Sequence, residues 1–224
     1  MSGAPAPIAT LQVDDVAAAT FHALSCDIMA GQVARFTCAV QAQREELWAL
    51  LTGLQRPRHG RISWAGQDLY ALPGRERLRL FQRVGAVPHD GGLISNLRAW
   101  ENIVLPVWYH RGIDVSRAEA EIVRIFRELG LENESIRRLM RCLPDPLSAG
   151  ERRWVAIARA MLMEPDIMVY DAPFTGVERD AAARLLRLIV QFHRARTERV
   201  SVFLLPDESF SERVPADITI ALET

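Results

Sequence analysis

Residues 147–176 constrain the fold of this chain more than any other stretch, and they read LSAGERRWVAIARAMLMEPDIMVYDAPFTG. Ser148 and Gly150 stand just before an apolar pattern of helical period, so the stretch predicts a helix that begins near them. Pro165 marks the end of that helix, because proline cannot continue the helical hydrogen-bond pattern. At such a helix start, backbone N–H groups and a hydroxyl face outward, which suits the binding of an anion.

The apolar run at residues 167–170 follows this helix and predicts a buried parallel strand. Asp171 stands at the carboxyl end of the predicted strand. In open α/β sheets ligands bind at that edge, and an aspartate there can reach a Mg²⁺ ion. Pro173 and Gly176 indicate a turn into the next helix. The stretch therefore predicts an α/β protein with Asp171 as a candidate metal ligand.

The order of these features closely resembles the signature motif, the Walker B strand and the D-loop of ATP-binding-cassette (ABC) ATPases. The family signature is usually LSGGQ, and residues 147–151 read LSAGE; the family strand ends in Asp-Glu-Pro, and residues 171–173 read DAP. The resemblance implies a P-loop NTPase-like ABC nucleotide-binding domain. Such a domain has a mixed core sheet with flanking helices, an antiparallel N-terminal β-subdomain and a helical subdomain that carries the signature.

The domain organisation expected from this resemblance is a single ABC-type domain over residues 1–224. Residues 1–10 are predicted to form a loose tail. The core α/β subdomain is expected at about residues 11–90 and 165–224, and the helical subdomain at about residues 91–164.

The phosphate loop of the family, GxxxxGK[ST], is altered at every position that binds phosphate. Residues 47–54 resemble the apolar helix that follows this loop and set the register. Cys38 and Gln43 then fall at the two glycine positions, Arg44 at the lysine and Glu45 at the hydroxyl residue. The lost glycines remove the close backbone approach to phosphate, and carboxylates repel it. All 27 basic residues are Arg, so no shifted alignment restores the lysine.

Three further positions that serve catalysis in the family are also changed. Ala172 replaces the glutamate that polarises water, His89 replaces the glutamine of the Q-loop, and Pro206 stands where the switch histidine is expected. The first connection, where the family places an adenine-stacking ring, has none, and Phe21 fits a core position better. A missing general base alone typically costs about 10²- to 10⁴-fold in rate. We therefore expect that the chain does not hydrolyse ATP at its own site.

The signature residues Ser148 and Gly150, with Glu151, are the exception to this loss. In ABC dimers the signature serves the nucleotide of the opposite subunit. The resemblance thus implies that ATP and Mg²⁺ bind only at a composite site with a second ABC ATPase whose phosphate loop is intact, in a heterodimer. Two alternatives remain open: a weak ATPase that uses Arg44 and Asp171, or a soluble ABC-fold scaffold without a permease.

Residues 90–97 and 100–106 narrow the resemblance to ATPase subunits of Mce-type transporters, which maintain outer-membrane lipid asymmetry. In ABC transporters this segment opens the helical subdomain and meets the integral-membrane permease. Candidate permease contacts are Leu97, Trp100, Glu101 and Trp108. Packing inside the helical subdomain is the alternative for each apolar residue among them. The resemblance implies a role in lipid transport.

The composition agrees with these expectations. The formal net charge is −1, from 27 basic and 28 acidic residues, which favours neither a nucleic acid nor an acidic membrane surface as a partner. The sequence contains no run of eighteen apolar residues and therefore predicts no membrane span. The three cysteines have no metal-ligand spacing, so a reducing compartment is indicated. The resemblance to ABC transporter subunits implies a peripheral protein on the cytoplasmic face of the inner membrane.

Overall fold

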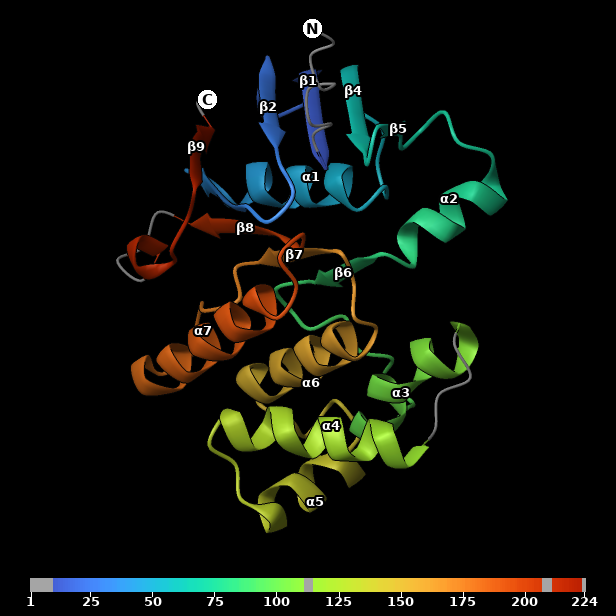
Figure 1. Ribbon diagram of the computed structural model, residues 1–224. Coiled ribbons are helices and arrows are strands. Elements are labelled where there is room, and N and C mark those ends of the chain that lie inside the picture. Colours follow the sequence, from blue (N-terminus) through green and yellow to red (C-terminus); the bar gives the residue numbers. More distant parts are fainter. Residues whose placement is uncertain (1–9, 111–114, 207–210, 223–224) are drawn as a thin grey trace, which may run out of the picture.

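The computed structural model describes residues 10–110, 115–206 and 211–222, so all but the last residue of the tail predicted at residues 1–10 lies outside them. Two β-sheets form the upper half of the molecule in Figure 1, and helices fill the lower half. Within the described residues, no helix is both long and apolar enough to cross a bilayer.

The smaller sheet is antiparallel and lies at the top of Figure 1. Its strands are β1 (Leu11–Ala17), β2 (Leu24–Ile28), β4 (His59–Trp64) and β5 (Gln67–Asp68), in the order β2-β1-β4-β5. In β1, Leu11 and Val13 are buried while Gln12 and Asp14 are exposed, the alternation of a sheet with one face on the core. This sheet confirms the predicted N-terminal β-subdomain.

The larger sheet has the order β6-β7-β8-β3-β9, and all of its pairings in the described residues are parallel. The strands are β3 (Val33–Cys38), β6 (Val84–Val87), β7 (Ile167–Asp171), β8 (Val200–Pro206) and β9 (Ile218–Leu222). All five residues of β7 are buried, because layers of structure cover both of its faces. The core sheet expected from the resemblance is thus the parallel one, and the antiparallel strands form a separate sheet.

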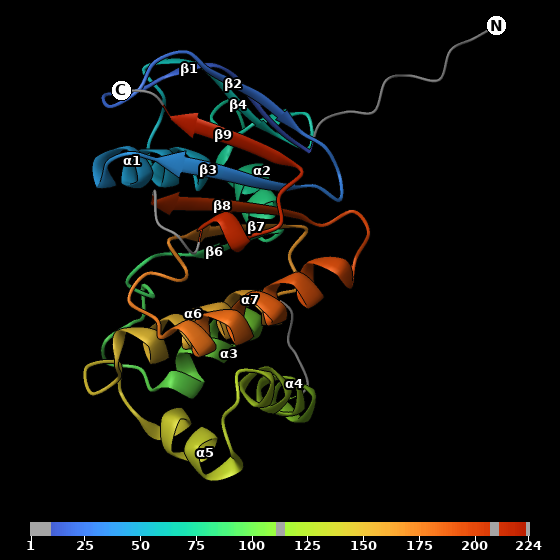
Figure 2. The same ribbon diagram turned by 90° about the vertical axis from the view of Figure 1, so that its left-hand side faces the viewer.

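Helices cover the parallel sheet on both sides. Helix α1 (Gln41–Leu51) lies between the two sheets, and α2 (Gly74–Phe81) lies beyond the β6 edge (Figures 1 and 2). Helices α6 (Ala149–Leu162) and α7 (Arg179–Arg194) cover the opposite face. Beyond them lie α3 (Ala99–His110), α4 (Val115–Glu128) and α5 (Asn133–Arg141), and the 3₁₀ turn Ser211–Arg213 precedes β9. Two apolar clusters result, one on each face of the parallel sheet.

The charged sequence after residue 131 predicts a polar link up to Pro144, but the structure forms helix α5 there. The segment is rich in charge, but Ile136 and Leu139 are three residues apart and therefore face the same side of a helix. Both side chains are buried in the apolar cluster of the helical subdomain. Burial of these two side chains by neighbouring helices favours the helix more than its charged composition opposes it.

Candidate nucleotide site and signature motif

The carboxyl end of β3 shows no wide phosphate loop. Strand β3 ends at Cys38 and α1 begins at Gln41, so only Ala39 and Val40 connect them. Gln43 and Arg44, which the register set by residues 47–54 placed at the end of a loop, lie instead within the first turns of α1. An anion between strand and helix needs backbone N–H groups that curve around it. Here the helix extends into the space of such a loop.

The N–H groups of the short connection are already hydrogen-bonded to a side chain. Gln43 Oε1 accepts from the backbone nitrogens of Ala39 at 3.1 Å and Val40 at 3.4 Å. Its Nε2 donates to the carbonyl of Thr20 at 3.3 Å. Gln43 has no exposed surface. A buried glutamine therefore satisfies the donors that would otherwise face a phosphate.

Arg44 reaches across the edge of the sheet to the Walker B aspartate. Its Nε lies 2.6 Å from Asp171 Oδ1, and His89 Nδ1 lies 3.3 Å from Oδ2 of the same carboxylate. The side chains of Arg44 and Asp171 are 10% and 2% exposed, so the pair is buried. Burial raises the pKa of Asp171 above its ordinary value, although Arg44 and His89 both favour the ionised carboxylate.

This arrangement does not fit a Mg²⁺ ion at Asp171, for which the sequence made that residue a weak candidate. Each carboxylate oxygen already contacts a nitrogen of a basic side chain, and a metal bound at either oxygen would compete with that contact. Mg²⁺ prefers oxygen ligands in an octahedral arrangement. In the part of the chain that the structure describes, no group of three or more His, Cys, Asp or Glu residues is placed to hold a metal.

Glu46 attaches α1 to the connection between β1 and β2. Its carboxylate accepts from the backbone nitrogens of Ala19 and Thr20, both at 2.8 Å, and from the Thr20 hydroxyl at 2.6 Å. Gln55 Nε2 adds a fourth hydrogen bond at 3.1 Å. Burial alone would raise the pKa of Glu46, but these hydrogen bonds outweigh it and lower the pKa. Glu46 thus holds the β1–β2 connection, which is the segment where ABC ATPases place the adenine-stacking ring.

Of the remaining altered positions, Ala172 and Pro206 have side chains without a polar group, and Glu45 lies on the exposed side of α1. Ala172 is buried, with a left-handed φ of 44°, and its nitrogen donates to the Leu204 carbonyl at 2.9 Å. Pro206 is the last residue of β8 and pairs with Cys38. Glu45 accepts from Gln41 at 2.6 Å on the exposed side of α1.

Phe21 is buried in the apolar cluster that contains the antiparallel sheet, so its ring is not available to stack on a base. Cys26, Cys38 and Cys142 are free thiols in the structure, Cys38 buried and the other two partly buried.

The signature motif keeps an accessible helix start. Ser148 is the N-cap of α6; its Oγ accepts from the Glu151 nitrogen at 3.2 Å, and Glu151 Oε2 accepts from the Ser148 nitrogen at 2.9 Å. This reciprocal pair is a capping box. Ser148 is exposed, and a Cβ added at Gly150 would meet only Ser148 Oγ, at 4.0 Å. The hydroxyl proton of Ser148 and the first N–H groups of the helix can therefore face an anion from outside.

Arg153 is a functional candidate that the sequence did not single out. Its side chain is buried within α6, with Nε and Nη2 donating to the His89 carbonyl at 3.2 and 2.8 Å. Nη1 donates to the Thr175 carbonyl at 2.7 Å. Arg153 therefore joins the signature helix to the Q-loop and to the D-loop. Burial lowers its pKa, while the charge of Asp171 opposes that change. The only feature of the sequence that could have identified Arg153 is its position next to apolar residues of the predicted helix.

Comparisons with known proteins agree with this geometry. The sequence profile of the family described as ABC transporter matches residues 46–175, more than half of the 224-residue chain. The chain belongs to the ABC transporter family. It is 30% identical over 196 residues to the lipoprotein-releasing system ATP-binding protein LolD of Xanthomonas campestris pv. campestris, over 87% of this chain and 79% of LolD.

A second relative of this ABC chain is the intermembrane phospholipid transport system ATP-binding protein MlaF of Haemophilus influenzae. The two are 29% identical over 149 residues, which cover 66% of this chain but only 54% of MlaF. Among solved structures, the dimeric ATP-binding cassette MJ0796 bound to ADP and Pi superposes with a TM-score of 0.81 at 19% identity, over 95% and 94% of the two chains. This confirms the predicted ABC fold.

The candidate permease contacts do not form one surface. Trp108 is 52% exposed on the outer side of α3, whereas Trp100 and Glu101 are partly buried beside a separate cavity. Leu97 is partly buried in the segment before α3. Glu101 caps that helix, because its Oε2 accepts from the Arg98 nitrogen at 2.7 Å. Its role in the structure is thus local.

Proposed function

We propose that this chain is an ABC transporter subunit that does not hydrolyse ATP at its own site and that completes the ATP site of a different subunit. The observation that carries the proposal is the ion pair between Arg44 and Asp171 across the sheet edge. The hydrogen bonds of Gln43 to the β3–α1 connection support it, because the same side chains would have to move before a triphosphate could enter.

The exposed signature supports the second half of the proposal. Ser148 and the first N–H groups of α6 offer donors to an anion, and preorganised donors of this kind stabilise charge on a transferred phosphoryl group. In a homodimer each signature would face another closed site. A heterodimer with a subunit that has an intact phosphate loop therefore suits the chain better, with ATP and Mg²⁺ held at the composite site.

An exposed apolar strip on α2 and α3 supports contact with an integral-membrane permease. The strip consists of Leu78 on α2 and Leu105, Trp108 and Tyr109 on α3, all of them more than one third exposed. A cavity of about 190 Å³ lies between these helices, β6 and α6, with Pro106 and Phe81 in its lining. Exposed apolar residues grouped in this way mark interaction surfaces. Of the predicted contacts, Trp108 belongs to this strip.

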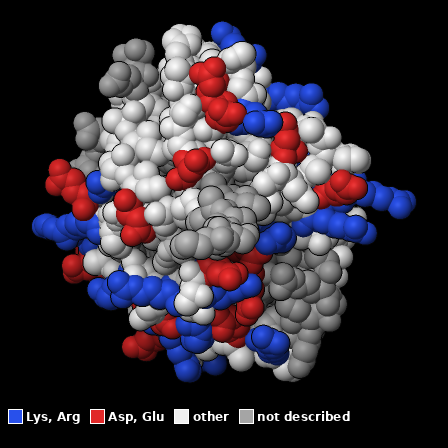
Figure 3. Space-filling view, turned by 45° about the horizontal axis from the view of Figure 1, so that its top comes forward, with Lys and Arg blue, Asp and Glu red and all other residues white. Residues whose placement is uncertain are grey.

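The relatives suggest what the transporter carries. One is named for intermembrane phospholipid transport and another for lipoprotein release, so a lipid-type substrate is the proposal for this chain. We infer that residues 1–224 form one ABC domain whose helical subdomain, at about residues 91–164, includes α3–α6. The corresponding location is the cytoplasmic face of the inner membrane, where the chain would attach to the permease. The surface in Figure 3 mixes acidic and basic side chains and does not favour nucleic acid as a partner.

The composite site can be tested in a purified complex of this chain, a permease and a competent ATPase subunit. Ser148→Arg places a bulky cation at the signature, and we expect it to abolish the ATPase activity of the complex. Thr197→Arg is the matched control, because Thr197 is exposed near Gly31, at the amino ends of the strands and away from the signature. Equal activity of the two variants would refute the composite site.

The two alternatives give different outcomes. A weak ATPase that uses Arg44 and Asp171 predicts that micromolar ATP with Mg²⁺ raises the melting temperature of the isolated chain. A closed site predicts no shift at that concentration. A scaffold without a permease predicts that the chain purifies with no membrane protein, and substitution of Trp108 by Glu would then leave its complexes unchanged.

A further inference from the structure

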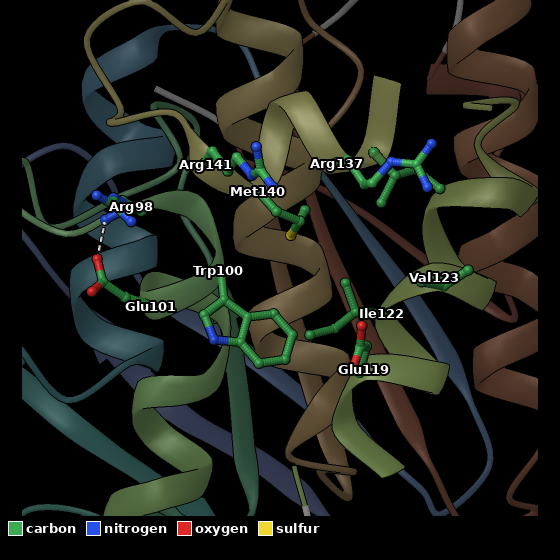
Figure 4. A pocket seen from close by; sticks show the side chains of 10 residues that line it. Arg98, Trp100, Glu101, Glu119, Ile122, Val123, Arg137, Met140 and Arg141 are labelled. Carbon is green, nitrogen blue, oxygen red and sulfur yellow. Dashed lines mark hydrogen bonds between the residues drawn. The ribbon is translucent and has the colours of Figure 1, made fainter. Parts of the chain in front are cut away.

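A second concave site lies within the helical subdomain, on a different side of α3 from the apolar strip. It is a cavity of about 340 Å³ between the start of α3, the middle of α4 and helix α5. Figure 4 shows the Trp100 ring at its centre. The apolar lining consists of Trp100, Ile122, Val123, Ile136 and Met140. Its volume is at the lower end of the range of about 300–1,000 Å³ for ligand-binding pockets, enough for one or two large side chains.

One end of this cavity carries two arginines, Arg98 and Arg141, and one lining carboxylate, that of Glu101 (Figure 4). Arg98 and Arg141 line it on the same side of Trp100 in Figure 4. Within the described residues, neither guanidinium group is in a salt bridge or side-chain hydrogen bond of the structure, although the charge of Arg141 helps to lower the pKa of Glu134. Arg137, which also lines the cavity, differs because it pairs with Glu134 at 2.7 Å. Two guanidinium groups at one end of a cavity suit a carboxylate, which arginine binds through paired hydrogen bonds.

The other end of the cavity carries the carboxylate of Glu119 together with the paired Arg137 (Figure 4). Glu119 on α4 lies across the Trp100 ring from Arg98 and Arg141 (Figure 4). A fatty acid or lysolipid could satisfy only the arginine end, because its other end is a hydrocarbon chain. A peptide segment can carry an acidic group, an apolar side chain and a donor at successive positions. The charge pattern therefore favours a peptide over a lipid.

We propose that this cavity binds an acidic amphipathic segment of a partner protein. A large apolar side chain of the segment contacts Trp100 and Met140, and its carboxylate pairs with Arg98 and Arg141. Protein interfaces are enriched in tryptophan, methionine and arginine, the residue types that gather here. A helix that lays its apolar face in a groove is a common mode of such recognition.

The cavity is linked to the signature through α5. Arg141 and Arg138 both belong to this helix, and Arg138 Nη2 lies 3.1 Å from Glu151 Oε1 in the capping box of α6. The chain continues from α5 through Cys142, whose carbonyl accepts from the Ala99 nitrogen at 2.8 Å. A segment bound to α3 and α5 would thus hold the residues that support the signature. This inference does not rest on the proposed permease contact.

A displayed library of helical peptides, selected on the full-length chain, tests the proposal. We expect the selected peptides to combine a Glu or Asp with a large apolar residue three or four positions away. Their affinity, measured by fluorescence polarisation, should fall about tenfold or more for Trp100→Ala and for the double variant Arg98→Glu, Arg141→Glu. Arg187→Glu is the matched control, because Arg187 is exposed on α7 and outside the cavity lining.

Two further measurements keep the test decisive. Arg141→Gln removes the charge without reversing it, and a thermal melt of each variant shows that the fold persists. Failure to select peptides that depend on Trp100 would overturn the proposal. So would binding of decanoate or of anionic phosphatidylglycerol vesicles that the double variant abolishes while peptide binding stays unchanged, since the cavity would then be a lipid site.

Discussion

Removal of the Arg44 guanidinium should destabilise the fold by leaving the Asp171 carboxylate buried without its closest partner. Arg44→Met keeps most of the side-chain volume and removes the charge. The ion pair is short, 2.6 Å, and its side chains are 10% and 2% exposed, so water can replace Arg44 only in part. Breaking a buried pair from one side typically costs about 3–5 kcal/mol.

Two features of the site limit the loss of unfolding free energy in Arg44→Met. Asp171 can escape its charge by taking up a proton, which at pH 7 costs at most about 4 kcal/mol for a carboxyl of ordinary pKa near 3.9. His89, 3.3 Å from the other carboxylate oxygen, remains as a partial partner. We therefore expect a loss of about 3 kcal/mol in the free energy of unfolding. For a chain of this size, that corresponds to a fall of about 6–12 °C in melting temperature.

Urea denaturation of the wild type and the variant measures this loss, with the melting temperature as a second readout. The double variant Arg44→Met, Asp171→Asn is the matched control, because it removes the charge that the single variant leaves behind. Its stability should recover to within about 1–2 kcal/mol of the wild type. A single-variant loss below about 0.5 kcal/mol would refute the reasoning, since the pair would then be no stronger than an exposed one.

Three further predictions concern parts of the fold that position the site. Hydrogen bonds hold the pKa of Glu46 below its ordinary value, so its carboxylate stabilises the fold at neutral pH. The difference in unfolding free energy between the wild type and Glu46→Gln should therefore narrow as pH falls from about 5 to 3. A difference that stays constant over this range would contradict the prediction. Gly53→Ala should destabilise, because φ is +73° and the new Cβ would lie 2.3 Å from the Phe81 ring; an unchanged urea midpoint would show that the ring moves freely. Leu139→Ala should cost about 2–5 kcal/mol, since α5 depends on this buried side chain, and a loss like that of an exposed substitution would place α5 outside the core.

Much of the fold could be predicted because its signals are local in the sequence. The order of signature helix, apolar strand and Asp171 depends on helical period, on a proline and on a run of buried residues, each read within a few positions. The same stretch identified the family, which the match over residues 46–175 confirms. Helix α5 was missed because its short apolar pattern becomes favourable only when other helices bury it.

The candidate site depended on contacts between residues distant in the sequence. From the sequence alone, the changes at Cys38, Gln43 and Arg44 could only be described as losses. Only the tertiary structure shows that the altered residues bind one another: Arg44 meets Asp171 across 127 positions, and Glu46 meets Thr20 across 26. Periodicity and motif spacing describe which face of an element a residue occupies, but not which side chain lies opposite it. That choice is made when the parallel sheet brings the ends of β3 and β7 to one edge, where a buried charge is stable only beside an opposite one.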